Sequence, residues 1–358
     1  MKFVHIADMH FDAPFVVLNS RTNWGEIRRI EQRDAFKKII NYIKENNINF
    51  LFIAGDLYEN EHIRESTIKY INDLFKQIPN TKIFISPGNH DPYINNSYYK
   101  TFQWEKNVII FSPIQTMYET PDADIYGIGF NDFYCKDLKA SEIKIKNKNK
   151  LNILVIHGTV DGSLENVEYN PMKKNMLKEL GFDYIALGHI HKLDYNSEEN
   201  QRIVYPGSTI SLGFDELGQH GMIVGELEKE KINLNFVQVD NKELKEINVD
   251  VTNINDKEEL VEKLNNLQLE ENFLYKVILI GKRKFEINIY NLYKLNIDAK
   301  IVKIKDTTKP DVDISILAKQ NNLKGLFVKE ILNEMENGNI DRDTLDNVLE
   351  IGLDILEK

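Results

Sequence analysis

Five short segments contain most of the histidine, aspartate and asparagine residues that could carry out chemistry. In chain order they are Asp8-Met9-His10, Gly55-Asp56, Gly88-Asn89-His90-Asp91, His157-Gly158 and Gly188-His189-Ile190-His191. Each stands at or just after a stretch whose apolar pattern predicts a strand. In an α/β fold, the residues that follow the carboxyl ends of neighbouring strands converge on one crevice. The segments can therefore deliver four imidazoles, two carboxylates and one amide to a single place.

This set of side chains predicts a site for two divalent metal ions. Imidazole and carboxylate together suit Mn, Fe or Zn, and the set contains no thiolate that would favour a softer metal. A carboxylate shared by two ions would hold them about 3.5–4 Å apart, as in two-metal phosphoryl chemistry. A water held between them would lose its proton near neutral pH and attack phosphorus in line, while the ions neutralise charge on the phosphate oxygens. The predicted chemistry is the hydrolysis of phosphate esters.

The elements that must position these segments alternate between strand and helix patterns. The first part of the chain predicts strands at 2–7, 49–54 and 82–86, with helices at 27–46 and 63–78 between them. Further strands are expected at 108–111, 125–128, 152–157, 184–187, 202–205, 221–227 and 231–239, with one helix at 171–180. Two sheets packed face to face, with helices outside, accommodate this α/β mixture.

The composition changes near residues 240–256, and the chain divides into three predicted parts. Residues 1–240 form the expected catalytic domain, and residues 241–306 form a small α+β module. Residues 307–358 hold a linker at 307–311 and two amphipathic helices, at 314–336 and 341–358, with Asp341 as the N-cap of the second. The apolar stripes of these helices either bury one another or the main domain, or they dock on a partner.

The distribution of charge along the chain indicates which partners each part could bind. The net charge of −11 argues against a surface coated with phosphate-binding basic patches. Lys144, Lys146, Lys148 and Lys150 still form a basic run, either a solvated turn or a surface that faces a phosphate backbone. Residues 306–358 contain 12 Asp and Glu against 6 Lys and Arg, which favours a protein partner over DNA for the tail.

Location and redox environment follow from simple features. No stretch approaches the roughly 18 uninterrupted apolar residues of a membrane span. Asp8 comes too early for a signal peptide. The single cysteine, Cys135, cannot form an internal disulfide and fits a reducing compartment, so we expect a cytoplasmic protein that does not bind membranes.

The ordered set of five motifs resembles the calcineurin-like metallophosphoesterases, over roughly residues 1–239. The resemblance implies their two-sheet αββα sandwich. It also implies a ligand set for two ions: Asp8, His10 and His191 on one, Asn89, His157 and His189 on the other, with Asp56 bridging.

The same resemblance assigns two catalytic residues. His90 resembles the family's histidine that contacts the phosphate and serves as the acid for the leaving oxygen, and Asp91 would orient it. For His5, His62 and His220 a structural role is expected, and Asp12 and Asp161 could simply cap turns.

Three features are similar to bacterial SbcD-like DNA repair exonuclease subunits of the YhaO type. They are the opening Ala7–Phe15, the segment Tyr184–Lys192 followed by Tyr205-Pro206-Gly207-Ser208, and the α+β module, which resembles their capping domain. Glu59 stands where archaeal and eukaryotic relatives have a histidine, which fits the bacterial branch. The resemblance implies a DNA nuclease that uses Mn, with Mg, Fe or Zn as alternatives. It also implies an SMC-like coiled-coil ATPase bound by the C-terminal helices, and a homodimer.

Two alternative functions stay open. A small-molecule or cyclic-nucleotide phosphodiesterase or phosphatase shares every metal ligand, so those residues cannot separate it from a nuclease. The α+β module and the helical tail favour the nuclease, because a minimal small-molecule enzyme needs neither. A scaffold without turnover is the other alternative, but such proteins typically lose ligands, whereas here the set is complete and includes His90.

Overall fold

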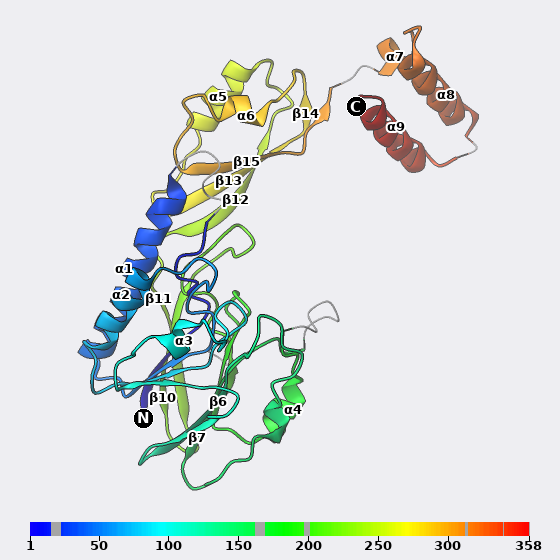
Figure 1. Cartoon of the computed structure of the whole chain (residues 1–358). Coiled ribbons are helices and arrows are strands. Elements are labelled where there is room, and N and C mark those ends of the chain that lie inside the picture. Colours follow the sequence, from blue (N-terminus) through cyan, green and yellow to red (C-terminus); the bar gives the residue numbers. More distant parts are fainter. Residues whose placement is uncertain (16–22, 162–168, 197–200, 312–313, 339, 358) are drawn as a thin grey trace. The chain divides into compact units, whose positions relative to one another are not determined.

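The computed structural model describes residues 1–15, 23–161, 169–196, 201–311, 314–338 and 340–357 (Figure 1). The chain divides into two compact units. The first comprises residues 1–247, 268–277 and 298–304, and the second comprises residues 248–267, 278–297 and 305–358. All five motifs belong to the first unit.

Strands and helices alternate along the chain, as the sequence predicts. In order they are β1 (Lys2–Ile6), α1 (Trp24–Glu45), β2 (Phe50–Ile53), α2 (Glu65–Phe75), β3 (Lys82–Ile85), α3 (Tyr98–Thr101), β4 (Val108–Ile110), β5 (Met117–Glu119), β6 (Ala123–Ile128), the 3-10 helix η2 (Ala140–Glu142), β7 (Leu151–His157), α4 (Lys174–Glu179), β8 (Tyr184–Gly188), β9 (Ile203–Val204), β10 (Gly221–Leu227), β11 (Ile232–Gln238), β12 (Glu243–Asp250), α5 (Lys257–Asn265), β13 (Phe273–Ile280), β14 (Lys282–Arg283), α6 (Ile289–Leu292), β15 (Ile301–Asp306), β16 (Lys309–Pro310), α7 (Ile314–Leu317), α8 (Leu323–Asn337) and α9 (Arg342–Glu357). Over the described residues, none of these helices combines the length and the apolar character that crossing a bilayer requires.

Two sheets carry the motifs. The larger has the order β11-β10-β1-β2-β3-β4 and the smaller has the order β5-β6-β7-β8-β9. Strands β1 to β4 run parallel, as do β6 to β9, whereas β10 pairs antiparallel with β1 and β5 with β6. Because parallel strands end at the same edge of a sheet, the loops after β1, β2 and β3 share one edge, and those after β7 and β8 share another.

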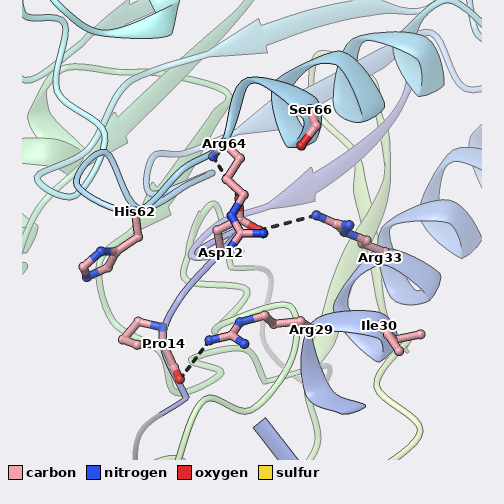
Figure 2. Close-up of a pocket in the computed structure, with 8 residues that line it drawn as sticks. All are labelled: Asp12, Pro14, Arg29, Ile30, Arg33, His62, Arg64 and Ser66. Carbon is pink, nitrogen blue, oxygen red and sulfur yellow. Dashed lines mark hydrogen bonds and ion pairs between the residues drawn. The ribbon is translucent and has the colours of Figure 1, made fainter. Parts of the chain in front are cut away.

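The loop after β1 is fixed to the start of α2. The carboxylate of Asp12 accepts hydrogen bonds from the Arg64 backbone N–H (3.0 Å) and from the Thr67 hydroxyl (2.8 Å), as Figure 2 shows for Arg64. Asp12 thus places a negative charge at the positive N-terminal end of α2. This anchor holds the loop that carries the first motif.

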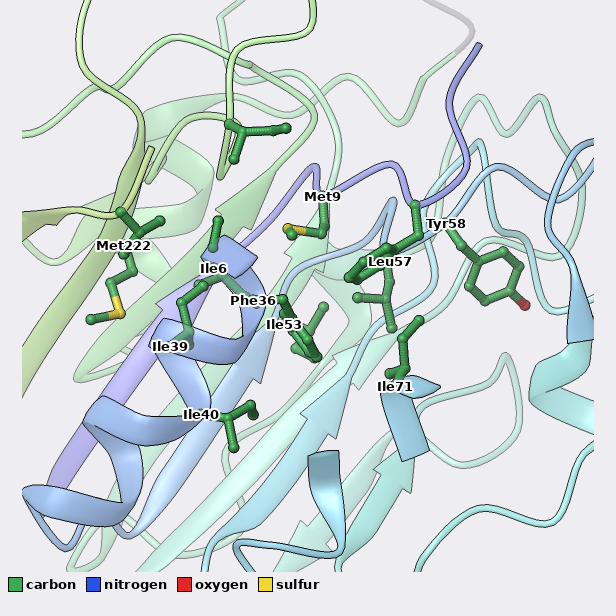
Figure 3. Packing of buried hydrophobic residues seen from close by; sticks show 14 of the residues in the cluster. Ile6, Met9, Phe36, Ile39, Ile40, Ile53, Leu57, Tyr58, Ile71 and Met222 are labelled. Carbon is green, nitrogen blue, oxygen red and sulfur yellow. The ribbon is translucent and has the colours of Figure 1, made fainter. Parts of the chain in front are cut away.

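One face of the larger sheet packs against helices α1 and α2. The buried side chains of this core come from alternate positions of β1, β2 and β3 and from the inner faces of the two helices, and they include Val4, Ile6, Leu51, Ile53, Ile83, Ile85, Phe36, Ile39, Ile40, Ile68 and Ile71. Figure 3 shows Phe36, Ile39 and Ile40 of α1 lying over the sheet beside Ile6 and Ile53. The period of two in the strands and the helical spacing in α1 explain why these residues meet.

The intervening positions of the same strands face the smaller sheet. This second core joins both sheets and includes Phe3, Phe50, Phe52, Phe84, Ile125, Ile153, Val155, Tyr184 and Ala186. A third core, on the outer face of the smaller sheet, includes Leu154, Ile156, Ile185 and Leu187, with Leu177 of α4 packed against them. The predicted sandwich of two sheets with helices on the outer faces is thereby confirmed.

Several elements differ from the sequence-based expectation. The helix expected at 171–180 begins only at Lys174, because Met172 instead pairs with Val160 in a β-bridge. The helix expected at 314–336 is divided into α7 and α8, since the Asn322 side chain caps α8 by accepting from the Gly325 N–H (2.9 Å). Within the expected linker, β16 pairs with β14. The pattern also failed to predict β5 and β12.

The C-terminal helices α7, α8 and α9 share a small apolar core of their own. It contains Leu317, Val328, Ile331, Leu345 and Leu349. The expected N-cap of the last helix is confirmed, because the Asp341 carboxylate accepts from the Thr344 N–H (2.8 Å). Lys358, the last residue of that expected helix, lies outside the described residues. The two apolar stripes are thus partly buried on each other, but Leu323, Leu326, Ile351 and Ile355 stay exposed.

Candidate metal centre

The structure brings the predicted ligands of all five motifs together between the ends of the two sheets. Three overlapping groups have ligand atoms that all lie within 4.8 Å of one another: Asp8 with His10 and His191, His10 with Asp56 and His90, and Asp56 with His157 and His189. The overlap at His10 and at Asp56 joins the three groups into one continuous cluster. Asn89 completes the cluster through its contacts with His157 and His189.

At one end of the cluster, two imidazoles face each other. Nε2 of His10 and Nε2 of His191 are 3.1 Å apart, and Nε2 of His191 is 3.9 Å from Oδ1 of Asp8. Each ring donates its Nδ1–H outwards to a carboxylate, His10 to Glu59 and His191 to Glu216, both at 2.6 Å. The inner nitrogens therefore present lone pairs, which repel one another unless a proton or a cation lies between them. This donor set fits a divalent ion.

The other end of the cluster has the same character. The Nδ1–H of His157 donates to the backbone carbonyl of Ala54 (2.8 Å), which turns its Nε2 towards Oδ1 of Asn89 (2.9 Å) and Oδ2 of Asp56 (3.3 Å). Nδ1 of His189 lies 3.1 Å from the same Asn89 oxygen. When His157 is neutral, its Nε2, Oδ1 of Asn89 and Oδ2 of Asp56 are three acceptor atoms that converge without a donor among them, and this arrangement also fits a cation.

Asp56 lies between the two ends. Its Oδ2 is 3.3 Å from Nε2 of His157 and 3.8 Å from Nε2 of His10, while its Oδ1 accepts from the His90 backbone N–H (2.8 Å). Asp8 is held in the same way, because its two oxygens accept from the backbone N–H of His189 (3.0 and 3.1 Å). Both carboxylates are buried, and each keeps an oxygen directed into the cluster.

Without a metal ion, the carboxylates of the protein favour the protonated forms of two histidines in this cluster. Burial opposes the charged form of His157 and His191, but Asp56 raises the pKa of His157, and Glu216 that of His191, to about 9 in each case. Burial, with the neighbouring His157 charge, lowers the pKa of His189 to about 3. Burial acts to raise the pKa of Asp56, but the positive charges of His157 and His10 bring it well below its usual value.

Unusual backbone conformations concentrate in these loops. Asp8, His10, Asp56 and His189 have φ values of 51°, 49°, 53° and 101°, in the left-handed region that residues with a Cβ rarely adopt. Each such residue costs of order 1–3 kcal/mol, and residues of this kind cluster at functional sites. The loops thus turn sharply at the residue that must point into the cluster.

A glycine next to the cluster is required by close packing. A Cβ on Gly88 would lie 2.2 Å from Oδ1 of Asp56, a separation that no real side chain tolerates. The glycines of the motifs are therefore part of the geometry that seats the ligands.

His90 is positioned by a residue outside the motifs. Its side chain is 45% exposed at the edge of the cluster, and its Nδ1–H donates to Oε2 of Glu59 (2.9 Å). Asp91, which was expected to orient His90, does not contact that ring. Its buried carboxylate instead accepts from the backbone N–H groups of Asp56, Leu57 and Gly88 and from the Tyr99 hydroxyl. Asp91 therefore holds the turns that carry Asp56 and His90, whereas Glu59 holds the imidazole.

Two carboxylates of this site escaped the sequence reasoning. Glu59 stood out only as a departure from other relatives, although its two oxygens accept from His10 and His90. Glu216 belongs to a loop without a motif, and it accepts from His191 and from the Ser208 hydroxyl (2.7 Å). The one sequence feature that could have pointed to Glu59 and Glu216 is that they are acidic, and acidic residues are too common in this chain for that to single them out.

The three histidines that were expected to be structural lie outside the cluster. His5 is buried between the Tyr184 hydroxyl (2.9 Å) and the Leu187 carbonyl (3.1 Å), and burial lowers its pKa to about 3. His220 contacts Ser208 and the Glu216 carbonyl. His62 is exposed beyond Glu59.

A cavity of about 230 Å³ opens beside His90 and Asn89. Its other lining residues are acidic or aromatic, namely Glu59, Glu61, Phe133, Tyr134 and Tyr169. The Tyr169 ring lies 5.1 Å from that of His189 and 5.9 Å from that of Tyr134, measured between ring centroids. An aromatic wall thus adjoins the cluster, where a planar group next to a phosphate could stack.

Comparison with known proteins agrees with this geometry. Residues 1–193 match the family described as calcineurin-like phosphoesterase. Similar proteins include the uncharacterized metallophosphoesterase YhaO of Bacillus subtilis, 26% identical over 262 residues, which are 70% of this chain and 64% of that protein. The match thus spans less than two thirds of the Bacillus protein.

Two further relatives are similar over a longer stretch. The SbcD subunit of the nuclease SbcCD of Staphylococcus saprophyticus is 26% identical over 305 residues, 77% of each chain. The DNA double-strand break repair protein Mre11 of Methanocaldococcus jannaschii is 25% identical over 301 residues, 80% of this chain and 77% of that one. With the family domain covering more than half of the sequence and its motifs gathered in one buried cluster, the chain belongs to the calcineurin-like phosphoesterases, a family of hydrolases that use a pair of divalent metal ions.

Proposed function

We propose that this chain cleaves phosphodiester bonds in DNA at two divalent metal ions, with Mn²⁺ as the ion that it uses best. The observation that carries the proposal is the ring of inward-facing acceptor atoms from the five motifs. DNA is favoured as the substrate because the matches to a nuclease subunit and to a DNA break repair protein extend well beyond the family domain.

In this proposal the ligands divide between the two ends of the cluster. One ion is held by Asp8, His10 and His191, and the other by Asn89, His157 and His189, with Asp56 shared. The outward hydrogen bonds of His10, His157 and His191 support this division of the ligands, because they fix each ring with a free nitrogen directed inwards.

The metal pair, when bound, supplies positive charge to the phosphate oxygens and makes a water acidic near neutral pH. The protein's own contribution to the chemistry centres on His90. Glu59 binds the Nδ1–H of His90, so Nε2 is the atom that holds the proton for the leaving oxygen. Asp91 and Tyr99 keep the turn that carries His90 in place. The aromatic wall of Phe133, Tyr134 and Tyr169 would stack on a base next to the cleaved phosphate.

Cleavage of end-labelled DNA beside cleavage of bis(p-nitrophenyl) phosphate tests this function. Protein stripped with EDTA should cut neither substrate, and Mn²⁺ should restore both activities more fully than Mg²⁺ or Zn²⁺. His90→Ala should lower DNA cleavage by about 100-fold or more, the usual contribution of a general acid. The small ester should lose less, because p-nitrophenolate leaves without an acid. Metal content measured by plasma mass spectrometry should equal that of the wild type.

Each other outcome has a definite meaning. If Mn²⁺-loaded protein cuts the small ester and leaves DNA intact, a small-molecule phosphodiesterase replaces the nuclease. If it binds two ions and cuts neither substrate, the fold is a scaffold. Equal loss on both substrates in His90→Ala would contradict the acid role.

The C-terminal helices are the proposed contact with an SMC-like ATPase partner. Their shared core makes α7, α8 and α9 a self-contained group, and side chains such as Ile351 and Ile355, 60% and 65% exposed, are left to dock. The acidic charge of the tail suits a protein partner better than DNA. A homodimer and a cytoplasmic location are further expectations that rest on the resemblance to SbcD-like subunits.

A further inference from the structure

A second cavity, of about 460 Å³, is formed by three separate segments of the first unit. We call it the arginine pocket; its lining residues are Asp12, Pro14, Arg29, Ile30, Arg33, His62, Arg64 and Ser66. The loop after β1, the first half of α1 and the turn into α2 each contribute to it (Figure 2). None of these residues has a role in the metal cluster described above.

The arginine pocket has more positive charge than its single carboxylate can balance. Arg29 donates to the carbonyls of Ala13 (3.3 Å) and Pro14 (3.2 Å), which are uncharged. Arg33 donates to the Thr67 hydroxyl (2.8 Å) and lies 3.4 Å from Asp12.

Arg64 is the third guanidinium. Its side chain makes no hydrogen bond or ion pair within the part of the chain that the structure describes, and in Figure 2 it extends into the pocket towards Arg33. Asp12 also accepts from the Arg64 N–H and from the Thr67 hydroxyl, so the one carboxylate among the lining residues is shared by several donors. An anion that enters the pocket meets donors that are already in place.

The other basic feature of the sequence is partly neutralised. In the run at residues 144–150, Lys146 pairs with Glu119, and Lys150 lies 3.2 Å from Asp124. These two acidic partners offset two of the run's four lysines. The arginine pocket is the better candidate for binding an anion, because its three guanidinium groups line one cavity and offer planar forks of N–H donors.

We propose that the arginine pocket binds a backbone phosphate of the nucleic-acid strand whose cleaved phosphodiester lies at the metal centre. The inference rests on the proposed nuclease function and adds a second contact with the same substrate. Guanidinium groups suit phosphate because their planar N–H fork matches two phosphate oxygens. The Ser66 hydroxyl supplies a further donor at the rim.

The chain connects the pocket directly to the metal centre. Asp12 follows His10 by two residues, and His62 and Arg64 follow Glu59, which binds both His10 and His90. Five residues of chain, from Glu59 to Arg64, reach at most about 18 Å. A strand with one phosphate per roughly 3.4 Å of helix rise spans that distance in about five nucleotides. One strand can therefore occupy both sites.

The test measures the binding of a fluorescein-labelled single-stranded oligonucleotide by anisotropy, in the His90→Ala background with Mn²⁺ present. Adding Arg64→Gln should raise Kd by about 5–10-fold and lower the slope of log K against log salt by about 0.7, as expected for one lost phosphate contact. Arg64→Lys should recover part of the affinity. Lys76→Gln is the matched control, because it removes an exposed charge at the far end of α2 and should change neither quantity.

Unchanged affinity and slope in Arg64→Gln, or no oligonucleotide binding in the parent protein, would overturn the inference. A measurement with inorganic phosphate distinguishes a nucleic-acid phosphate from a free phosphate ion as the ligand of the pocket. If Arg64→Gln abolishes phosphate binding by calorimetry but leaves the oligonucleotide Kd unchanged, the pocket is a small-anion site and the inference also fails. Circular dichroism confirms that each variant is folded.

The proposed function and this inference can fail separately. In the wild-type background, Arg64→Gln should leave hydrolysis of bis(p-nitrophenyl) phosphate unchanged, because that ester is too small to reach the arginine pocket. If the oligonucleotide contact is found but DNA is not cut, the nuclease function fails and the binding site stands. If DNA is cut and Arg64→Gln binds the oligonucleotide as tightly as its parent, the nuclease function stands and the arginine pocket is not a binding site for the strand.

Discussion

Single residues outside the five motifs decide how the imidazoles of the cluster are presented. Glu59 and Glu216 each accept an Nδ1–H, and this turns the Nε2 atoms of His10 and His191 towards each other. Burial acts to raise the pKa of Glu59, but its hydrogen bonds to His10 and His90 lower it to about 2. Glu59 therefore stays ionised at neutral pH and can accept from both rings at once. One carboxylate thus couples a proposed metal ligand to the proposed acid.

Glu59→Gln should lower metal affinity or kcat by about 10–100-fold, the usual cost of losing such an outer partner of a metal site. The physical reason is that one end of the glutamine amide is an NH₂ group, which cannot accept from an imidazole N–H. Either His10 or His90 then loses its partner. Metal titration and steady-state kinetics on the small ester would measure the effect.

Glu61→Gln provides the matched control, because Glu61 lines the same cavity beside His90 and is exposed. We expect near wild-type activity from it. If Glu59→Gln retains both metal affinity and kcat, Glu59 has no positioning role.

Sequence reasoning located the residues of the cluster but not all of their partners. The five motifs were recognisable because each follows a buried strand, and such strands end at shared edges. Glu216 had no such signal, since its hydrogen bond to His191 depends on how a distant loop folds back. For Asp91 the error came from adjacency, because side chains next to each other in sequence can point to different groups. Its carboxylate faces the backbone of the Asp56 turn, away from His90.

At the scale of elements, the strand-to-loop turns set the geometry of the site. Each of the loops after β1, β2 and β8 bends at a residue with positive φ, and the glycine before Asn89 packs directly on Asp56. The parallel order β1-β2-β3 places three of the turns at one edge. The turns themselves therefore decide whether Asp56 can reach both ends of the cluster.

Gly88→Ala should displace Asp56, because the added Cβ would lie 2.2 Å from its Oδ1. We expect loss of bound metal and at least about 10-fold lower activity, as for other disturbed ligands. Metal analysis and kinetics on the small ester would measure it. Gly213→Ala is the control, since a Cβ there meets nothing within 4 Å. A fully loaded, active Gly88→Ala protein would show that the turn adapts.

The strands and helices around the motifs could be predicted because their apolar periods are regular. Short or mostly polar elements could not. Strand β12 buries only Leu244 and Val249 among charged neighbours, so its alternation is weak. The break between α7 and α8 depends on one side-chain cap at Asn322, which competes with a continuous helical pattern. In both cases local polar groups outweigh the apolar period.

At the scale of the whole molecule, we expect the C-terminal helices to be dispensable for the catalysis proposed for the first unit. Among the described residues, the side chains of their core all come from α7, α8 and α9 and their immediate neighbours in sequence. The sequence pattern alone predicts a linker at 307–311, but Lys309–Pro310 pairs with Lys282–Arg283. A truncation should therefore end after Asp311, so that this small sheet is kept.

Truncation after Asp311 should leave kcat and KM for bis(p-nitrophenyl) phosphate within about twofold of the full chain, since every residue of the metal cluster belongs to the first unit and the removed helices have a core of their own. It should also abolish co-purification with the proposed ATPase partner. Ile351→Asp in the full chain should weaken the same complex, because that side chain is exposed and apolar. A truncated chain that still co-purifies with the ATPase would place the contact elsewhere.

The central position of β1 has a consequence for how the protein is made. β1 pairs with β2 on one side and with β10 on the other, and 226 residues separate Met1 from its hydrogen-bond partner Leu227. At a synthesis rate of about 5–20 residues per second, that edge of β1 waits roughly 10–45 s on the ribosome before its partner exists. An unpaired strand edge is a template for wrong pairing. The nascent chain is therefore exposed to aggregation until β10 emerges, and slow translation or a missing chaperone should reduce the yield of folded protein before any catalytic residue is affected.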